Sequence, residues 1–127
     1  MTKDATRILQ TVLVVEDDES FRTMLVSALE RRGYDARGVA DGASAIALGQ
    51  HDSPEMAVVD LRLTDMSGLD VVRELKAIDP ATAVVVLTGY GSIATALEAI
   101  RLGAVHYLTK PADTDRVLEA FEHGLAA

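Results

Sequence analysis

A chain of 127 residues with a hydrophobic content of 49% is long enough to bury a core and is typical of one globular domain, not of a disordered chain. The formal net charge of −8 argues against direct binding to nucleic acid, and the lack of cysteine excludes disulfides, thiolate metal sites and a cysteine nucleophile. No apolar run is long enough to span a membrane, and no signal-peptide core follows Met1, so we expect a soluble cytoplasmic protein.

The first part of the chain predicts two strands and two helices. Residues 1–10 are polar and predict a flexible N-terminal segment ahead of a single domain over 11–127. The predicted elements are a strand over 11–15, a helix after the four acids at 16–19 that Gly33 ends, a weaker strand over 34–39, and a short helix from Asp41 through Leu48. The polar interruptions of the second strand place it near an edge of the sheet.

The remainder continues the alternation of strands and helices. The predicted elements are strand 55–60, helix 69–78, strand 83–88, helix 92–102, strand 105–109 and helix 113–125. Ser92 is the expected N-cap of the fourth helix, which carries Ile93, Leu97 and Ile100 along one side.

This alternation predicts one α/β domain with parallel βαβ units and a doubly wound parallel sheet that has helices on both faces. The carboxyl ends of parallel strands meet at one edge of such a sheet. Acids follow the first strand, and Asp60, Thr88 and Lys110 end the third, fourth and fifth strands. Any one of these could be a helix cap or a surface residue, but all four together predict a shared site.

Three of the converging side chains are carboxylates, namely Glu16, Asp17 and Asp60. Carboxylates this close raise one another's pKa values unless a cation joins them. Oxygen ligands of this kind suit a hard divalent ion, and we expect Mg²⁺. Asp18 and Glu19 suit the first turn of the following helix, where the helix dipole favours acids.

Asp60 has two functional interpretations, as a metal ligand only or as a nucleophile that forms an aspartyl-phosphate. Lys110 offers a point charge for a phosphoryl oxygen and Thr88 offers a hydroxyl donor. A site that only binds metal has no use for the lysine, so the set favours the phosphoacceptor.

Together these residues resemble the receiver domain of two-component response regulators over essentially the whole chain. The motifs that carry the resemblance are Glu16-Asp17 after the first strand, Asp60 with Gly68 eight residues later, Thr88-Gly89, and the run from Tyr107 to Lys110-Pro111. The resemblance implies a flavodoxin-like (βα)5 fold with strand order 2-1-3-4-5. It also implies that Lys110-Pro111 is a cis peptide.

The resemblance implies that Asp60 accepts a phosphoryl group from a sensor histidine kinase. Mg²⁺ would be held by Asp17, Asp60 and the backbone carbonyl of Arg62, with Glu16 acting mainly through water. Thr88 would bond the phosphoryl group and Tyr107 would rotate inward. The domain would catalyse only its own phosphotransfer and dephosphorylation, and in that sense it is not an enzyme.

The switched surface would consist of the fourth helix, the fifth strand and the fifth helix, and its composition permits a homodimer. The finer pattern resembles redox-responding global regulators of the RegA/ActR/PrrA type, which control transcription through a DNA-binding helix-turn-helix that this chain does not contain. One departure stands out, because most receivers carry proline four residues after the phosphoacceptor and this chain carries Thr64.

Two other classes of function remain open on the residues alone. A Mg²⁺-dependent phosphohydrolase would also use an aspartyl-phosphate, although Leu61 and Arg62 follow Asp60 where such enzymes carry a second aspartate. A nucleotide or flavin binder would need a Gly-rich phosphate loop after the first strand, where this chain has acids.

Overall fold

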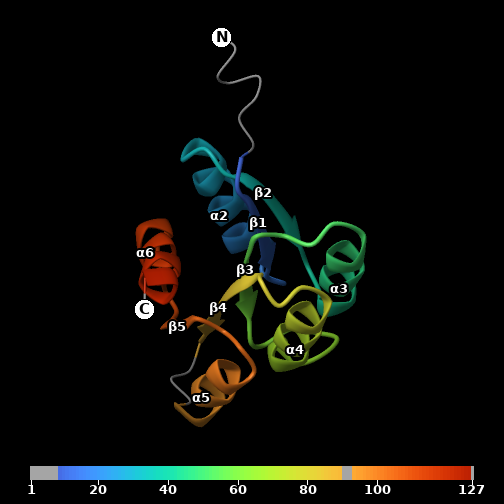
Figure 1. Cartoon of the computed structure of the whole chain (residues 1–127). Helices are drawn as coiled ribbons and strands as arrows, with labels where there is room; N and C mark the ends of the chain where they lie inside the picture. The colour runs from blue at the N-terminus through green and yellow to red at the C-terminus, as the bar shows by residue number, and fades with distance from the viewer. Residues whose placement is uncertain (1–8, 90–92, 127) are drawn as a thin grey trace.

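The computed structural model of this chain describes residues 9–89 and 93–126, with side chains as far as residue 122. The described residues form five strands and five helices in strict alternation (Figure 1). In chain order they are β1 (Thr11–Val15), α2 (Glu19–Arg31), β2 (Asp35–Val39), α3 (Gly42–His51), β3 (Met56–Asp60), α4 (Gly68–Ile78), β4 (Ala83–Thr88), α5 (Ile93–Arg101), β5 (His106–Thr109) and α6 (Thr114–Ala126). Most of the predicted flexible segment, and the predicted N-cap Ser92, lie outside the described residues.

All strand pairs in the sheet are parallel, and the spatial order is β2-β1-β3-β4-β5. The predicted fold class and strand order are therefore confirmed, and β2 is an edge strand as its polar interruptions indicated. The order reverses between β1 and β3. In open α/β sheets, the crevice outside the carboxyl ends of the strands at such a reversal is where ligands bind.

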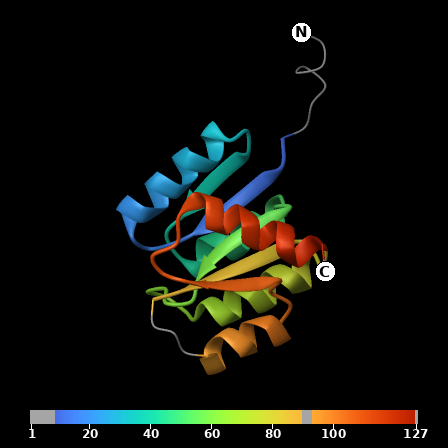
Figure 2. The same cartoon turned by 90° about the vertical axis from the view of Figure 1, so that its left-hand side faces the viewer.

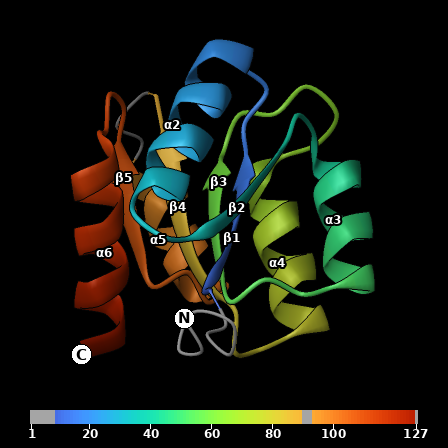
Figure 3. The same ribbon diagram turned by 90° about the horizontal axis from the view of Figure 1, so that it is seen from above.

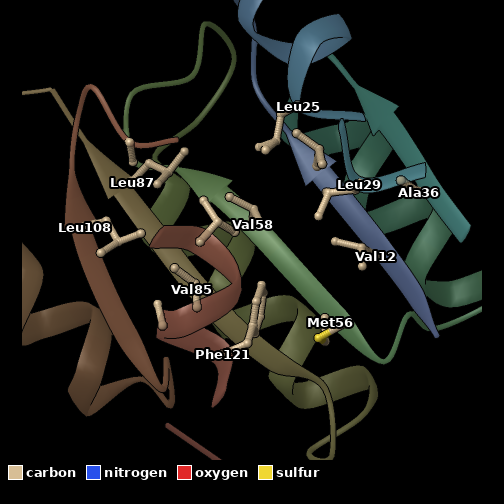
Figure 4. Close-up of a cluster of buried hydrophobic side chains, with 14 of the residues drawn as sticks. Val12, Leu25, Leu29, Ala36, Met56, Val58, Val85, Leu87, Leu108 and Phe121 are labelled. Carbon is tan, nitrogen blue, oxygen red and sulfur yellow. The ribbon is translucent and has the colours of Figure 1, made fainter. Parts of the chain in front are cut away.

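Helices cover both faces of the sheet (Figure 3). On one face, α2 and α6 enclose a cluster that includes Val58 and Val85 from the central strands with Leu25 and Phe121 from the helices (Figure 4). On the other face, α3, α4 and α5 pack against the alternate residues of the same strands. The central strands are buried on both faces, which explains their continuous apolar sequence.

The helix starts follow the capping residues in the sequence. Asp18 caps α2 by accepting a hydrogen bond from the Phe21 N–H at 3.1 Å, and Asp41 caps α3 through the Ser44 N–H at 2.7 Å. Helix α3 continues to His51, one turn beyond the predicted end at Leu48. Gly33 ends α2 with a φ of +92°, a conformation that glycine adopts at little cost.

Helix α5 lies on the outside of the molecule (Figure 2). Its large apolar residues are exposed to solvent. Ile93 is 68% exposed and Leu97 is 54% exposed, whereas Ala96 and Ala99 are buried. The periodicity of the sequence predicted an apolar side with Ile93 and Leu97, but the residues buried against the sheet are the small alanines. A helix that packs through alanine approaches the sheet closely and leaves an apolar outer face.

Candidate functional site

The carboxyl ends of β1, β3 and β5 bring a lysine and two carboxylates into direct contact. Lys110 Nζ lies 2.6 Å from Glu16 Oε1 and 2.9 Å from Asp60 Oδ2. These residues are separated by as many as 94 positions in the chain, so only the sheet can bring them together. The predicted convergence of these strand ends is present in the structure.

Asp60 is held on both oxygens. Its Oδ2 accepts a hydrogen bond from Lys110, and its Oδ1 accepts one from the backbone N–H of Arg62 at 3.0 Å. The side chain is buried at the end of β3 yet lies at the rim of the sheet. An ionised carboxylate in this position has an ammonium on one flank and a backbone amide on the other.

Gly68 lets the chain return close to Asp60. A Cβ at this position would overlap the carbonyl oxygen of Asp60 and the Cα of Leu61, which are backbone atoms that cannot move aside. The Gly68 N–H donates to the Leu61 carbonyl at 3.0 Å, and an isolated antiparallel bridge joins Arg62 to Ser67. These contacts close the base of the β3–α4 loop.

Three carboxylates form a candidate cation site at the same place. Glu16, Asp17 and Asp60 each offer an oxygen, and these oxygens all lie within 4.8 Å of one another. Asp17 is exposed while the other two are buried, so the set faces solvent on one side. Lys110 contacts two of these acids, Glu16 and Asp60, and an oxygen donor set with three carboxylates fits a hard divalent cation.

The electrostatics of the site are set by burial and by the hydrogen bonds between Lys110 and the two carboxylates. Burial raises the pKa of Glu16 to about 7, against the lowering effects of Lys110 and the Asp18 N–H. Burial acts to lower the pKa of Lys110, but its hydrogen bonds to Glu16 and Asp60 outweigh this and raise it. Lys110 is therefore a firmly protonated cation at neutral pH.

The loop that carries Glu16 is fixed by two residues that the sequence analysis did not single out. Arg22 Nη1 donates to the Glu16 carbonyl at 2.8 Å, and its side chain crosses Gly38 on β2. A Cβ at Gly38 would come within 2.9 Å of Arg22 Cγ. A glycine inside a strand is a known signal of close approach, and it could have pointed to this contact.

Thr88 and Tyr107, the predicted switch residues, lie on neighbouring strands. Thr88 is buried at the end of β4, and its carbonyl accepts a hydrogen bond from the Lys110 N–H at 2.8 Å. Tyr107 is 36% exposed on β5, and its ring contacts the His106 ring at 5.9 Å between centroids. The Lys110-Pro111 peptide is cis, as the resemblance implied.

Comparison with known proteins identifies relatives of this chain. Residues 12–122 match the response regulator receiver domain family. The photosynthetic apparatus regulatory protein RegA of Cereibacter sphaeroides is 48% identical over 114 residues, which cover 87% of this chain and 60% of that protein. The acid tolerance regulatory protein ActR of Rhizobium meliloti is 45% identical over 111 residues, which cover 87% of this chain and 57% of that protein.

The chain thus spans about three fifths of the length of these two curated relatives. Among solved structures, a response regulator protein from Burkholderia pseudomallei superposes with a TM-score of 0.85 and 40% identity, covering 88% of this chain and 66% of that one. That crystal contains a phosphorylated aspartic acid, a calcium ion and citrate. In the part of the chain that the structure describes, no helix is long and apolar enough to cross a membrane.

Proposed function

Since this chain belongs to the response regulator receiver domain family, we propose that Asp60 is its phosphoacceptor in a two-component signalling system. The observation that carries the proposal is the position of the Asp60 carboxylate. It is buried, 2.9 Å from the Lys110 ammonium, and grouped with the carboxylates of Glu16 and Asp17. The donor would be a phosphohistidine on a sensor histidine kinase.

The reaction is a phosphoryl transfer between two side chains. An oxygen of Asp60 forms a bond to phosphorus while the bond from phosphorus to the histidine nitrogen breaks, and the electron pair of that bond stays on the nitrogen. With acetyl phosphate as donor, a P–O bond breaks and acetate leaves. The remaining work of the site is to position the carboxylate and to stabilise negative charge on the phosphoryl oxygens.

Charge stabilisation is divided between a metal ion and protein donors. The carboxylates of Asp17 and Asp60, with Glu16 beside them, would hold Mg²⁺. The resemblance to receiver domains adds the Arg62 carbonyl as a ligand and a water between Glu16 and the ion. When bound, Mg²⁺ would supply positive charge to the phosphoryl group. Lys110 supplies the ammonium on the other flank, and Thr88 supplies a hydroxyl at the end of β4. These groups lie at or directly after the carboxyl ends of four strands, β1, β3, β4 and β5.

The output would follow from a change in packing. Thr88 would move toward the new phosphoryl group, Tyr107 would turn inward, and the surface of α5, β5 and α6 would change shape. The exposed apolar side of α5 lies on this surface and suits a homodimer. We infer that the readout is transcription control, as the names of curated relatives such as the transcriptional regulatory protein ZraR suggest. The net charge of −8 gives this domain little attraction for nucleic acid, so a separate domain would bind the DNA.

The phosphohydrolase alternative predicts catalytic turnover. Position 62, where such an enzyme would place its second aspartate, holds Arg62, and it is the backbone N–H of Arg62 that reaches Asp60. We therefore expect Asp60 to be modified once per molecule and a generic phosphate ester to show no turnover.

Intact mass spectrometry after incubation with acetyl phosphate and Mg²⁺ tests the proposal. The wild-type chain should gain one phosphoryl group, and the gain should disappear in Asp60→Asn and on removal of Mg²⁺ with a chelator. An amide spectrum of Asp60→Asn checks that the variant is folded. An equal mass gain in the folded Asp60→Asn variant would exclude Asp60 as the acceptor.

A further inference from the structure

The β3–α4 loop carries an exposed aspartate whose side chain contacts a different helix. Asp65 Oδ1 accepts a hydrogen bond from the Gly42 N–H at 2.9 Å, and Asp65 Oδ2 accepts one from the Ala43 N–H at 2.9 Å. Both oxygens of one carboxylate are thus bonded to the first two amides of α3. Sequence reasoning did not single out Asp65, because nothing in the local sequence shows where the tip of this loop lies.

The first backbone N–H groups of α3 need hydrogen-bond acceptors other than the N-cap residue Asp41. A helix leaves its first amides without partners inside the helix. Among the described residues, the side chain of the N-cap Asp41 accepts from the Ser44 N–H, and the Gly42 and Ala43 amides donate to Asp65. Those two hydrogen bonds lower the pKa of Asp65, so the carboxylate is ionised at neutral pH and stays an acceptor.

An apolar contact next to Asp65 joins the same two segments. A Cβ at Gly42 would overlap the Met66 side chain, so the glycine leaves the space in which Met66 lies. Met66 also packs against the hydrophobic cluster on the α3 and α4 face of the sheet. The loop is therefore attached to α3 by a charged contact and by an apolar one.

The other end of this loop is joined to the phosphoacceptor. The Arg62 N–H donates to Asp60 Oδ1, and the bridge from Arg62 to Ser67 closes the loop below the Asp65 tip. The Arg62 carbonyl, a proposed metal ligand, lies three residues before Asp65 in the chain. A change at Asp65 can reach this carbonyl through a short, closed segment of backbone.

Thr64 lies in the same loop, at the position where most receiver domains carry proline. Proline at this position would fix φ near −65° and stiffen the loop. Threonine leaves φ free, so an unrestrained loop would sample more conformations. In this chain the contacts of Asp65 and Met66 with the start of α3 would supply the restraint that a proline ring supplies locally.

We propose that Asp65 is a positioning residue for the phosphoacceptor site, which holds the β3–α4 loop against α3 so that the Arg62 carbonyl and Asp60 keep the geometry for Mg²⁺ binding. This inference rests on the proposed function, because it assumes that the Arg62 carbonyl is a metal ligand. Asp65 does not touch the reacting atoms, and its effect passes through the loop backbone.

Mg²⁺ titration of the unphosphorylated protein, followed in amide NMR spectra, tests the role of Asp65. We expect Asp65→Ala to bind Mg²⁺ about tenfold more weakly, as for the loss of other groups that orient metal ligands. Amide hydrogen exchange at Gly42 and Ala43 should also become faster. Asp65→Asn should be intermediate, because an amide side chain has one oxygen acceptor where the carboxylate has two.

Two further variants separate positioning from simple capping of α3. In the Asp65→Ala background, Thr64→Pro should restore Mg²⁺ affinity but leave fast exchange at Gly42 and Ala43. The matched control is Asp79→Ala, which removes a half-buried aspartate that also accepts a backbone N–H, from Ala81 at 2.9 Å, at the amino ends of the strands. It should leave Mg²⁺ affinity unchanged.

Wild-type affinity in Asp65→Ala together with faster exchange would overturn the proposal and leave Asp65 as a helix cap. Wild-type affinity with unchanged exchange would overturn it as well, since the contact would then restrain nothing. Failure of the proposed function looks different, because in that case the wild-type chain itself takes up no phosphoryl group from acetyl phosphate with Mg²⁺.

Discussion

The two ends of the parallel strands carry similar residues in different electrostatic environments. We call the side with the carboxyl ends of the strands, where Glu16 and Lys110 lie, the carboxyl edge, and the side with the amino ends, where Lys76 and Asp79 lie, the amino edge. At the amino edge, the Asp79 carboxylate accepts hydrogen bonds from the Ala81 N–H and the Ser53 hydroxyl, and these bonds lower its pKa. At the carboxyl edge, burial raises the pKa of Glu16 to about 7. Hydrogen bonds at the amino edge stabilise the ionised form of Asp79, whereas burial at the carboxyl edge destabilises the ionised form of Glu16.

The two edges also use lysine differently. At the amino edge, Lys76 Nζ donates to two backbone carbonyls, those of Pro80 at 2.6 Å and Thr82 at 2.9 Å. At the carboxyl edge, Lys110 Nζ is shared between two carboxylates, with a third from Asp17 nearby. Among the described residues no buried side-chain nitrogen or oxygen lacks a partner, so the edges differ in charge balance and not in hydrogen bonding.

This difference indicates that the contacts of the amino edge stabilise the fold, whereas those of the carboxyl edge serve a chemical function at a cost in stability. The amino edge joins its loops to one another with neutral or solvated contacts, such as the buried hydrogen bond from Thr82 Oγ1 to the Pro54 carbonyl at 2.8 Å. The carboxyl edge groups three carboxylates that a cation can neutralise. Strongly shifted ionisable groups in such a crevice are typical of a functional site. Three predictions, from the largest expected effect to the smallest, test this contrast, and a fourth concerns a surface outside both edges.

The largest effect is expected for the lysine of the carboxyl edge. Lys110→Ala should lower the initial rate of phosphorylation by acetyl phosphate by about 100-fold, as for the loss of one transition-state donor. Lys76→Ala, the matched lysine of the amino edge, should leave that rate unchanged. The rates are measured by intact mass over time, and similar rates in the two variants would remove the distinction between the edges.

The pH dependence of stability should differ with and without Mg²⁺. Glu16 binds a proton more tightly when folded, with a pKa of about 7 against 4.5 for the ordinary group. Between these values the folded state holds more protons than the unfolded state, so stability falls as pH rises, by roughly 3 kcal/mol in total. Added Mg²⁺ favours the carboxylate and should flatten this slope.

Urea unfolding from pH 4.5 to pH 7.5, with and without Mg²⁺, measures this slope. Glu16→Gln should abolish the part of the slope that Glu16 causes. If the stability of wild type falls no more steeply with pH than that of Glu16→Gln, in the absence of Mg²⁺, Glu16 is not buried in the way that the structure indicates.

A smaller effect on stability alone is expected at the amino edge. Thr82→Val keeps the shape of the side chain but removes the hydroxyl that bonds the Pro54 carbonyl, which leaves a buried acceptor without a partner. The free energy of unfolding should fall by about 1–2 kcal/mol. Phosphorylation of the folded variant should proceed at the wild-type rate, and a slower rate would mean that the two edges are coupled.

The smallest effect is expected on the outer side of α5, which belongs to neither edge. Leu97→Ser should change the free energy of unfolding by no more than about 0.5 kcal/mol, because the side chain is already exposed. Its phosphorylation should also match wild type. If the phosphorylated protein dimerises through this surface, the variant should dimerise more weakly in analytical ultracentrifugation.

The sequence predicts those residues of the site that lie at the carboxyl ends of strands. Apolar runs that end in Asp60, Thr88 and Lys110 alternate with helical patterns, and alternation requires parallel strands whose ends meet. The strand order and the cis peptide came from the resemblance to receiver domains, because periodicity alone does not order strands.

Contacts between loops and the orientation of one helix were not predictable in this way. The apolar periodicity of α5 does not reveal that Ala96 and Ala99 face the sheet while Leu97 faces outward. The contacts of Arg22 with the Glu16 carbonyl and of Asp65 with α3 depend on where two separate segments meet in space. The sequence signals of these contacts are the glycines that permit them, Gly38 beside Arg22 and Gly42 beside Met66.

Chemical mapping of the modified residue tests the central claim most directly. The protein would be phosphorylated with acetyl phosphate and Mg²⁺ and then reduced with borohydride, which converts an aspartyl-phosphate to homoserine, and its peptides would be sequenced by mass spectrometry. The account predicts homoserine at position 60 and unmodified aspartate at position 17. Homoserine at position 17, or a phosphorylated chain with none at position 60, would contradict it.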